Sequence, residues 1–432
     1  MAKKQVKSII RPALKWSRRG LLTLFVSYLI LLAGFSEFDP SPVDLAVSRY
    51  QYSILNWELT HLPDKWTHKI AGILPGSPNR TQAEKFAQVE EFFDLGVELR
   101  NLERQILFPQ TESAGQTSTP DNTTPLKIDI YNIKEKRQRL QADVEEIIET
   151  EISKVLNQEG ISSPIGIFPP VDAVFTSSPH VLILSPRDKI ERQQDILLNP
   201  GLSGLEKSSI EGEIFFKKDD LSVYIEDTGG VAVYPSVVTD KFGLQSTTEI
   251  TSHEWIHHWL LFRPLGRGFW SGAAMASLNE TVATLAGQEL GDKVYASLTG
   301  EVLNRTRPSS TTIPDPNAFD FRTEMQEARL QAEEFLSAGK IEEAEAYMEE
   351  RRQIFVDHGY LIRKLNQAYF AFHGTYAASA ASISPIGGQV QQLRDQSDSL
   401  EHFLKTVSGF STYLEFVEHL EGLPESQEES KK

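Results

Sequence analysis

The chain has 432 residues, a net charge of −17 and no cysteine. This length is enough for two or three domains with a substantial core, and the negative charge argues against nucleic acid as a partner. The absence of cysteine excludes disulfides and thiolate metal sites, and it leaves the redox compartment open.

The N-terminus joins a basic segment to an apolar one. Residues 1–19 carry seven lysines and arginines and no acid, and residues 20–36 carry no charge. This pattern predicts a cytoplasmic tail at 1–19, a transmembrane signal anchor at 20–36 that contacts the lipid bilayer, and an extracytoplasmic remainder. The alternative is a cleaved signal peptide and a secreted protein, for which Gly34-Phe35-Ser36 offers a mediocre cleavage site, so the anchor is favoured.

Residues 37–160 are predicted to be a membrane-proximal helical region. An amphipathic helix is expected over residues 44–59. Apolar residues then recur at helical spacing over 92–106 and again over 133–155, on either side of a loop rich in Ser, Thr and Pro at 109–125. We expect an antiparallel helical hairpin, either packed on the rest of the protein or free as a stalk that could bind a protein partner.

The pattern changes after Gly160. Short β-branched and aromatic runs, bounded by Pro, Asp and Gly, predict a small sheet. Its expected strands are residues 171–175, 181–185, 213–217, 221–226 and 231–238.

The motif H-E-x-x-H follows at His253–His257, inside an apolar run of helical period. Residues 246–249 (Ser-Thr-Thr-Glu) read as a capping box that starts this helix, and Pro264 is expected to stop it. Imidazoles four residues apart project from one helix face and can hold one zinc ion. The alternative is a core helix whose histidines are merely hydrogen-bonded.

A zinc site on this motif needs a base and a third ligand. Glu254, next to the first histidine, can act as general base on a metal-bound water. Glu280 is the candidate third ligand, at the start of a second helix-like run over residues 279–290. His258 follows the second ligand but points about 100° away from it, which is typical of packing rather than of a metal ligand.

Together these residues resemble the gluzincin metallopeptidases, which carry H-E-x-x-H on one helix and N-E-x-x-[SA] on the next. The resemblance implies a thermolysin-like α+β core with a zinc ion held by His253, His257 and Glu280. Members of this family place an aspartate four residues after the glutamate ligand to orient the first histidine. Thr284 stands at that position here, so Asn279 and Thr284 are the candidates for contacts behind the ligands.

The resemblance also implies how a substrate is bound. Such folds bind an extended peptide along an edge strand, and Val231, Ala232 and Val233 are the candidates for it; an ordinary strand after a glycine turn is equally open. Aminopeptidases of this group carry a glutamate in that strand. The segment 229–238 has none, which slightly favours an endopeptidase.

The last part of the chain is predicted to be helical. Residues 319–355 are strongly charged and break at Gly339-Lys340, which predicts a solvated helical hairpin, and a polar tail ends the chain. One later helix presents Tyr369, His373 and Tyr376 on one face. Gluzincins take a Tyr or His from this region to stabilise the oxyanion, so His373 and Tyr376 are candidate catalytic residues.

The sequence thus predicts an α+β fold: one transmembrane helix, an N-terminal helical hairpin, a small mixed sheet with the zinc-binding helices at 161–300, and a helical C-terminal domain at 301–432. The predicted function is a membrane-anchored zinc peptidase acting on peptide or protein substrates. One alternative is a membrane-tethered scaffold with an idle zinc site. Another, an intramembrane protease, conflicts with the short apolar stretch at 250–262.

Overall fold

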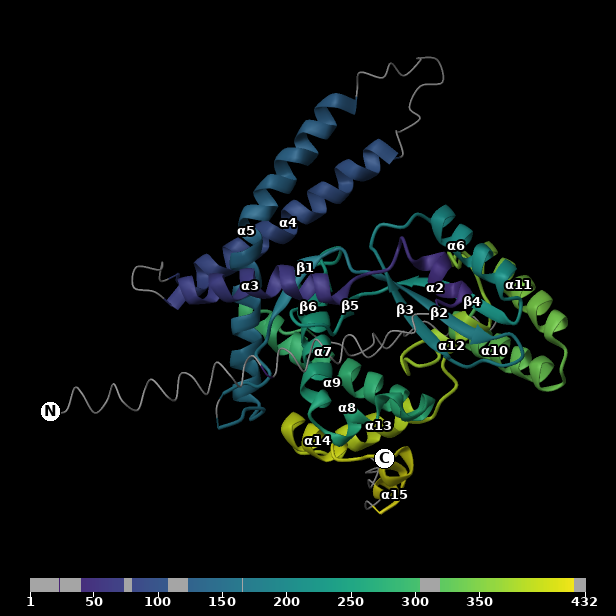
Figure 1. The fold of residues 1–432 in the computed structure, drawn as a ribbon. Helices are drawn as coiled ribbons and strands as arrows, with labels where there is room; N and C mark the ends of the chain where they lie inside the picture. The colour runs from purple at the N-terminus through teal and green to yellow at the C-terminus, as the bar shows by residue number, and fades with distance from the viewer. Residues whose placement is uncertain are drawn as a thin grey trace. The chain divides into compact units, whose positions relative to one another are not determined.

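The computed structural model describes Thr23 and residues 40–73, 80–107, 123–164, 166–303 and 319–422. The chain divides into two compact units, residues 1–48 and residues 49–432. In the first unit the described residues form helix α2 (Pro42–Val47), which begins with a reciprocal capping box between Ser41 and Asp44. The other helices and the strands named below belong to the second unit (Figure 1).

The predicted transmembrane anchor requires a correction. Among the described residues, none of the helices has both the length and the apolar character needed to cross a membrane. The predicted tail at 1–19 and anchor at 20–36 lie outside the described residues, apart from Thr23. The uncharged apolar run over 20–35 is also shorter than the ~20 residues that span a bilayer. The prediction of a single-pass membrane protein with an extracytoplasmic catalytic domain therefore does not stand.

The second unit begins with three helices: α3 (Ile54–Ile73), α4 (Gln82–Leu107) and α5 (Thr123–Gln158). The single amphipathic helix predicted over 44–59 is wrong, because residues 48–50 form a turn and Gln51 pairs with Leu198. The predicted hairpin of long helices is formed by α4 and α5 (Figure 1). It packs on the rest of the unit, since Phe92 of α4 and Ile148 of α5 lie in the main hydrophobic core.

Two three-stranded sheets stand where one small mixed sheet was predicted. In the first sheet, ordered β1-β6-β5, β1 is parallel to β6 and β5 is antiparallel to it. The second sheet, ordered β3-β2-β4, is antiparallel throughout. The strands are β1 (Ala173–Thr176), β2 (His180–Pro186), β3 (Gln194–Leu198), β4 (Leu221–Asp227), β5 (Gly230–Val231) and β6 (Ser236–Thr239).

The strand predicted over 213–217 is wrong, because these residues end helix α6 (Gly204–Lys217). Ser203 begins this helix with a capping box. Ile210 and Ile214, four residues apart, bury one face of it, and Phe216 is 89% exposed. A run of bulky residues looked like a strand, but its burial follows the helical period.

The outer edge of β1 is closed by two carboxylates of α5. The N–H groups of Ala173 and Phe175 donate to Glu149 and Glu145, each over 2.9 Å. Alternate residues of a strand are about 6.6 Å apart, and four residues of a helix rise about 6 Å, so the two spacings match. Helix α5 therefore takes the place of a further strand.

The edges of the second sheet are also covered. Along β3, the N–H of Tyr52 donates to the carbonyl of Leu197 over 2.9 Å. Along β4, the carbonyl of Val223 accepts from Lys364 and Asn366, and that of Ile225 from Arg363. Strand β5 is different. It is the other edge strand of the first sheet, and no further strand pairs with its outer side in the described part of the chain.

Helices α7 (Leu244–Leu261) and α9 (Ala273–Thr299) pack directly against each other. Glycines of α9 allow the close approach: a Cβ added to Gly287 would lie 2.9 Å from the Cα of His253, and one added to Gly291 would lie 2.6 Å from the Cα of Glu249. The capping box predicted to start α7 is wrong, since Gly243 occupies the N-cap. Pro264 does end the helix, and it begins the next one.

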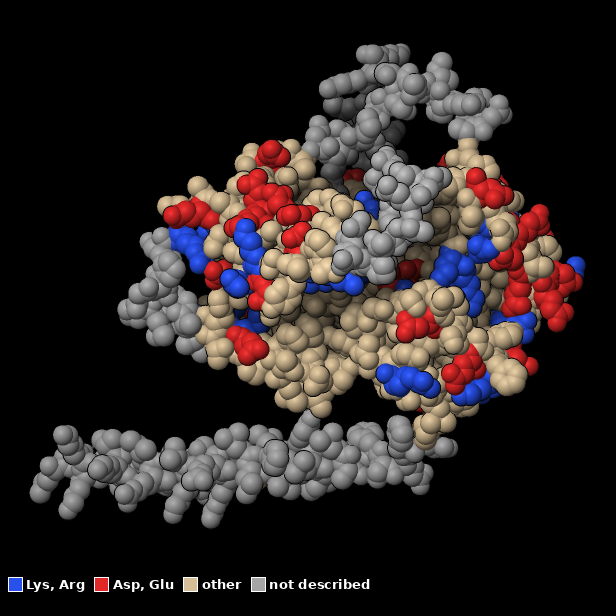
Figure 2. Space-filling model, turned by 90° about the horizontal axis from the view of Figure 1, so that it is seen from above, with Lys and Arg blue, Asp and Glu red and all other residues tan. Residues whose placement is uncertain are grey.

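The remaining helices complete the unit. The charged pair α10 and α11 is divided at Gly339, whose φ of +72° ends the first helix in the left-handed region. Figure 2 shows acidic side chains gathered at the side of the unit where α11 lies in Figure 1. The bounds are α8 (Pro264–Arg267), the 3-10 helix η2 (Phe269–Ser271), α10 (Phe321–Ser337), α11 (Ile341–Asp357), α12 (Gln367–His373), α13 (Ile386–Asp395), α14 (Leu400–Val407) and α15 (Tyr413–Glu421).

Candidate metal centre

Three side chains from α7 and α9 converge on one point. The Nε2 atoms of His253 and His257, one turn apart on α7, are 3.0 Å from each other. Oε2 of Glu280, on α9, lies 3.6 Å from the first of these atoms and 3.5 Å from the second. The three form a nearly equilateral triangle of donor atoms that face one another across the helix interface.

The site is enclosed but still open to solvent on one side. The side chains of His253 and His257 are 20% and 15% exposed, whereas that of Glu280 is 9% exposed. Burial, and after it the charge of His257, lowers the pKa of His253 to about 4. Burial also acts to lower the pKa of His257, but the carboxylate of Glu280 outweighs it and raises this pKa to about 9. One of the two imidazoles is therefore neutral and ready to donate a lone pair at neutral pH.

A second layer of contacts orients these ligands. Nδ1 of His257 lies 2.9 Å from Oδ1 of Asn279, the residue before Glu280. His253 hydrogen-bonds to the backbone carbonyl of Ala283. The sequence indicated Asn279 and Thr284 for this layer; the structure places Asn279 on His257 and assigns the contact with His253 to the backbone one residue before Thr284. Contacts of this kind fix the ring orientation of a metal-binding histidine.

Glu254 stands beside the triangle rather than at a corner of it. Its carboxylate is buried, and burial raises its pKa to about 8. His253, Glu254 and His257 have donor atoms close enough together to hold a metal ion. Glu280 is the better third ligand on geometry, because a single oxygen of it lies within 3.6 Å of both imidazole nitrogens. Glu254 therefore stands outside this set of three donor atoms.

Strand β5 runs directly over Glu254. A Cβ added to Gly230 would lie 2.9 Å from Cγ and Cδ of Glu254. The N–H of Thr239, at the end of β6, donates to the carbonyl of Gly229 over 2.8 Å. The backbone carbonyl of Gly229 therefore points toward β6. Backbone direction alternates along a strand, and the N–H and C=O of Gly230 therefore point to the open edge.

Of the three residues predicted to bind the substrate, only Val231 belongs to β5. Val231 pairs with Val237 of β6. The backbone of Ala232 and Val233 lies beside the buried side chain of His258. The residue nearest to Glu254 is thus Gly230, just before the predicted three.

The two candidate oxyanion donors are placed differently. Tyr376 lies three residues beyond the end of α12, and its pKa is raised well above the ordinary value by burial and then by the charge of Glu280. Its hydroxyl is therefore protonated near the metal ligands. His373 instead has its Nε2 3.0 Å from Oε2 of Glu226, which also accepts from Tyr224. The charge of Glu280 thus acts on Tyr376, whereas His373 is engaged by Glu226.

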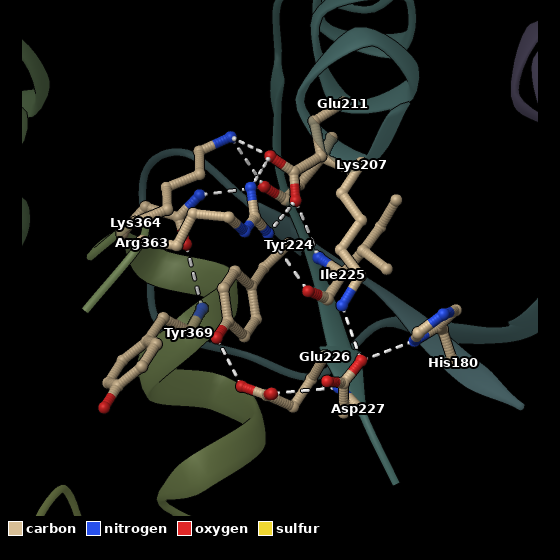
Figure 3. A network of polar contacts seen from close by, with 12 residues as sticks. His180, Lys207, Glu211, Tyr224, Ile225, Glu226, Asp227, Arg363, Lys364 and Tyr369 are labelled. Atoms are coloured by element: carbon tan, nitrogen blue, oxygen red, sulfur yellow. Dashed lines mark hydrogen bonds and ion pairs between the residues drawn. The ribbon is translucent and has the colours of Figure 1, made fainter. Parts of the chain in front are cut away.

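The two acids that precede β5 already have partners (Figure 3). Burial acts to raise the pKa of Glu226, but the hydrogen bonds from His373 and Tyr224 outweigh it and lower the pKa. Asp227 lies 2.5 Å from both Nδ1 of His180 and Nζ of Lys207. Glu226 thus joins β4 to α12, and Asp227 joins β4 to β2 and α6.

Arg192 is a further residue near the site, and the sequence did not single it out. Its Nε donates to both oxygens of Asp195, over 3.0 and 2.8 Å. Its guanidinium lies 5.3 Å from the ring centre of Phe372, which in turn lies 5.4 Å from the ring of Tyr376. It comes from the turn before β3, far from the motif in sequence, so only the fold could reveal it. No protein family, curated protein or solved structure matches the chain.

Proposed function

We propose that this protein is a zinc-dependent peptidase that cleaves internal peptide bonds. The observation that carries the proposal is the triangle formed by His253, His257 and Glu280. Zinc bound tetrahedrally at 2.0–2.2 Å requires its ligand atoms to be about 3.3–3.6 Å apart. The distances of 3.5 and 3.6 Å to Glu280 agree with this geometry, and the 3.0 Å between the two imidazole nitrogens is about 0.3 Å shorter than the range. The donor set of two imidazoles and one carboxylate leaves a fourth position for substrate or water.

Each residue then has a definite task. Zinc supplies Lewis acidity, which activates water and polarises the peptide carbonyl. Glu254 accepts a proton from the attacking water and donates it to the nitrogen of the leaving amine. Burial favours the protonated form of Glu254, so the positive charge of a bound metal would have to lower this pKa for the carboxylate to act as the base. Tyr376, held protonated, donates a hydrogen bond to the oxyanion.

The substrate backbone is proposed to lie along β5. An extended peptide can accept a hydrogen bond from the N–H of Gly230 and donate one to its C=O, as an added strand does. This edge passes over Glu254, so a peptide bond held here lies beside the base. The edges of β1, β3 and β4 are covered, which supports β5 as the place of strand addition.

Cleavage of internal bonds is favoured over removal of N-terminal residues. An aminopeptidase needs a carboxylate to bind the free amine of its substrate. Glu226 and Asp227 are the acids closest to β5 in sequence, and both are engaged by other side chains of the protein. Neither offers an unpaired carboxylate.

The test compares three variants of the full-length protein with the wild type. We expect about one zinc per chain in the wild type, with hydrolysis of internally quenched peptides. Glu254→Gln should retain the zinc and lose the hydrolysis, and Glu280→Ala should lose both. Glu249→Gln, which removes a charge from the same helix one turn earlier, serves as the matched control. A wild-type protein that binds zinc and cleaves none of a broad peptide library would contradict the proposal.

A further inference from the structure

Gly230 is a glycine without a conformational reason to be one. Its φ lies outside the left-handed region, where glycine is otherwise required. It pairs with Val238 in regular antiparallel register. Glycine in a strand is unfavourable by itself, because it adds backbone entropy and contributes no packing. A requirement for space must therefore account for it.

The space is taken up by Glu254. A Cβ on Gly230 would lie 2.9 Å from both Cγ and Cδ of that side chain, and closer still to Oε1. Carbon atoms in contact are normally about 3.5–4.0 Å apart. The preceding Gly229 differs sharply: its Cβ would meet Cδ1 of Ile250 at 3.5 Å, an ordinary contact. Of two adjacent glycines, only one faces the candidate base.

We propose that Gly230 is a positioning residue that keeps the carboxylate of Glu254 beside the metal ligands. This rests on the proposed peptidase function. The backbone of β5 forms one wall of the space that holds the carboxylate, and the missing side chain allows that wall to stand close. Glu254 is 6% exposed, so the carboxylate has little room on its other sides.

The effect of a methyl group here follows from what it meets. The nearest atoms belong to the end of a side chain and not to the backbone, so the carboxylate moves and the fold persists. The three atoms nearest to the added one all belong to Glu254 and none to His253, His257 or Glu280, so metal binding should survive. Proton transfer requires the base within hydrogen-bond distance of the water. The protein therefore loses turnover while keeping its metal.

The experiment compares Gly230→Ala with Gly229→Ala in the full-length protein. For Gly230→Ala we expect wild-type zinc content, a KM close to that of the wild type and a kcat lower by about 100-fold or more, the usual contribution of a positioned acid–base group. Its pH profile should also change, because a displaced carboxylate has a new environment. Gly229→Ala should resemble the wild type in all four measurements. Equal kcat values for the two variants would overturn the proposal.

A double-mutant cycle separates this role from a general role in the strand. In the Glu254→Ala background, the methyl group that Gly230→Ala adds has room. Gly230→Ala should therefore lower the melting temperature when it is made in the wild type, but not when it is made in Glu254→Ala. The same decrease in both backgrounds would overturn the steric basis. This readout does not depend on hydrolysis. A wild-type protein without peptidase activity would contradict the proposed function, and with it the positioning role of Gly230 in catalysis. The double-mutant cycle would then still test the packing of Gly230 on Glu254.

Discussion

The contact between Gly287 and His253 gives the sharpest prediction about the metal centre. A Cβ added to Gly287 would lie 2.9 Å from N, Cα and Cβ of His253. Normal carbon contacts of about 3.5–4.0 Å require α7 and α9 to separate by about 0.6–1 Å. Because Glu280 is on α9, its distances of 3.5 and 3.6 Å to the imidazoles would then exceed 4 Å, beyond what one zinc ion can bridge.

We therefore expect Gly287→Ala to lose both stability and metal affinity. Overpacking of this kind costs about 1–3 kcal/mol in the free energy of unfolding. Metal affinity should fall by about 10- to 100-fold or more, as when a ligand loses its support. Urea unfolding in the presence of a chelator measures the first quantity, and competition with a zinc indicator measures the second.

Two other glycines serve as controls. Gly291→Ala adds a Cβ 2.6 Å from the Cα of Glu249, one turn farther from the metal ligands, so it should cost stability with a smaller effect on affinity. Gly212, on the exposed face of α6, has open space around it, and Gly212→Ala should stabilise the protein by about 0.4–1 kcal/mol. Wild-type stability and affinity in Gly287→Ala would refute the close packing of α7 on α9.

Three further predictions concern the oxyanion, the protons and the sheet edge. Tyr376→Phe should lower kcat by about 10²–10³-fold with zinc content unchanged, whereas Tyr369→Phe, on the same segment, should not; steady-state kinetics would show the difference. Because the pKa of His257 is raised to about 9, zinc must displace a proton below that pH. Zinc affinity should thus rise about tenfold per pH unit between pH 7 and 8, and calorimetry in buffers of different ionisation enthalpy should detect about one released proton; an affinity independent of pH would contradict the shift. Arg363→Ala removes a bidentate partner of the buried Glu211 but leaves Lys364 beside that carboxylate, so it should cost about 1.5–3 kcal/mol, a loss that urea unfolding would measure.

The parts of the site that could be predicted from the sequence lie close together along the chain. Two histidines four residues apart share a helix face wherever a helix forms, and the apolar run around them predicted that helix. Asn279 and Glu280 were found through a second pattern of the same kind. In the structure these residues meet because α9 crosses α7 on glycines, a contact that no local pattern specifies.

Other parts could not be predicted because they depend on contacts between distant segments. Gly230 acquires its importance only from Glu254, which approaches it from another element. The helix at 204–217 was missed for a different reason, since the capping box at Ser203 was visible in the sequence but the run of bulky residues at its end favoured a strand. Pairing of residues 50–52 with β3 likewise broke the helix predicted over 44–59.

The closure of the sheet edges has a consequence for self-association. A strand with free N–H and C=O groups attracts strands from other molecules, which is how many proteins begin to aggregate. Here the exposed backbone of three edges is already occupied by carboxylates, cations or an extended segment. The edge that a substrate would use, β5, is two residues long. Under the proposed function a peptide would be held there and released, whereas a stretch this short does not nucleate the addition of many strands from other molecules.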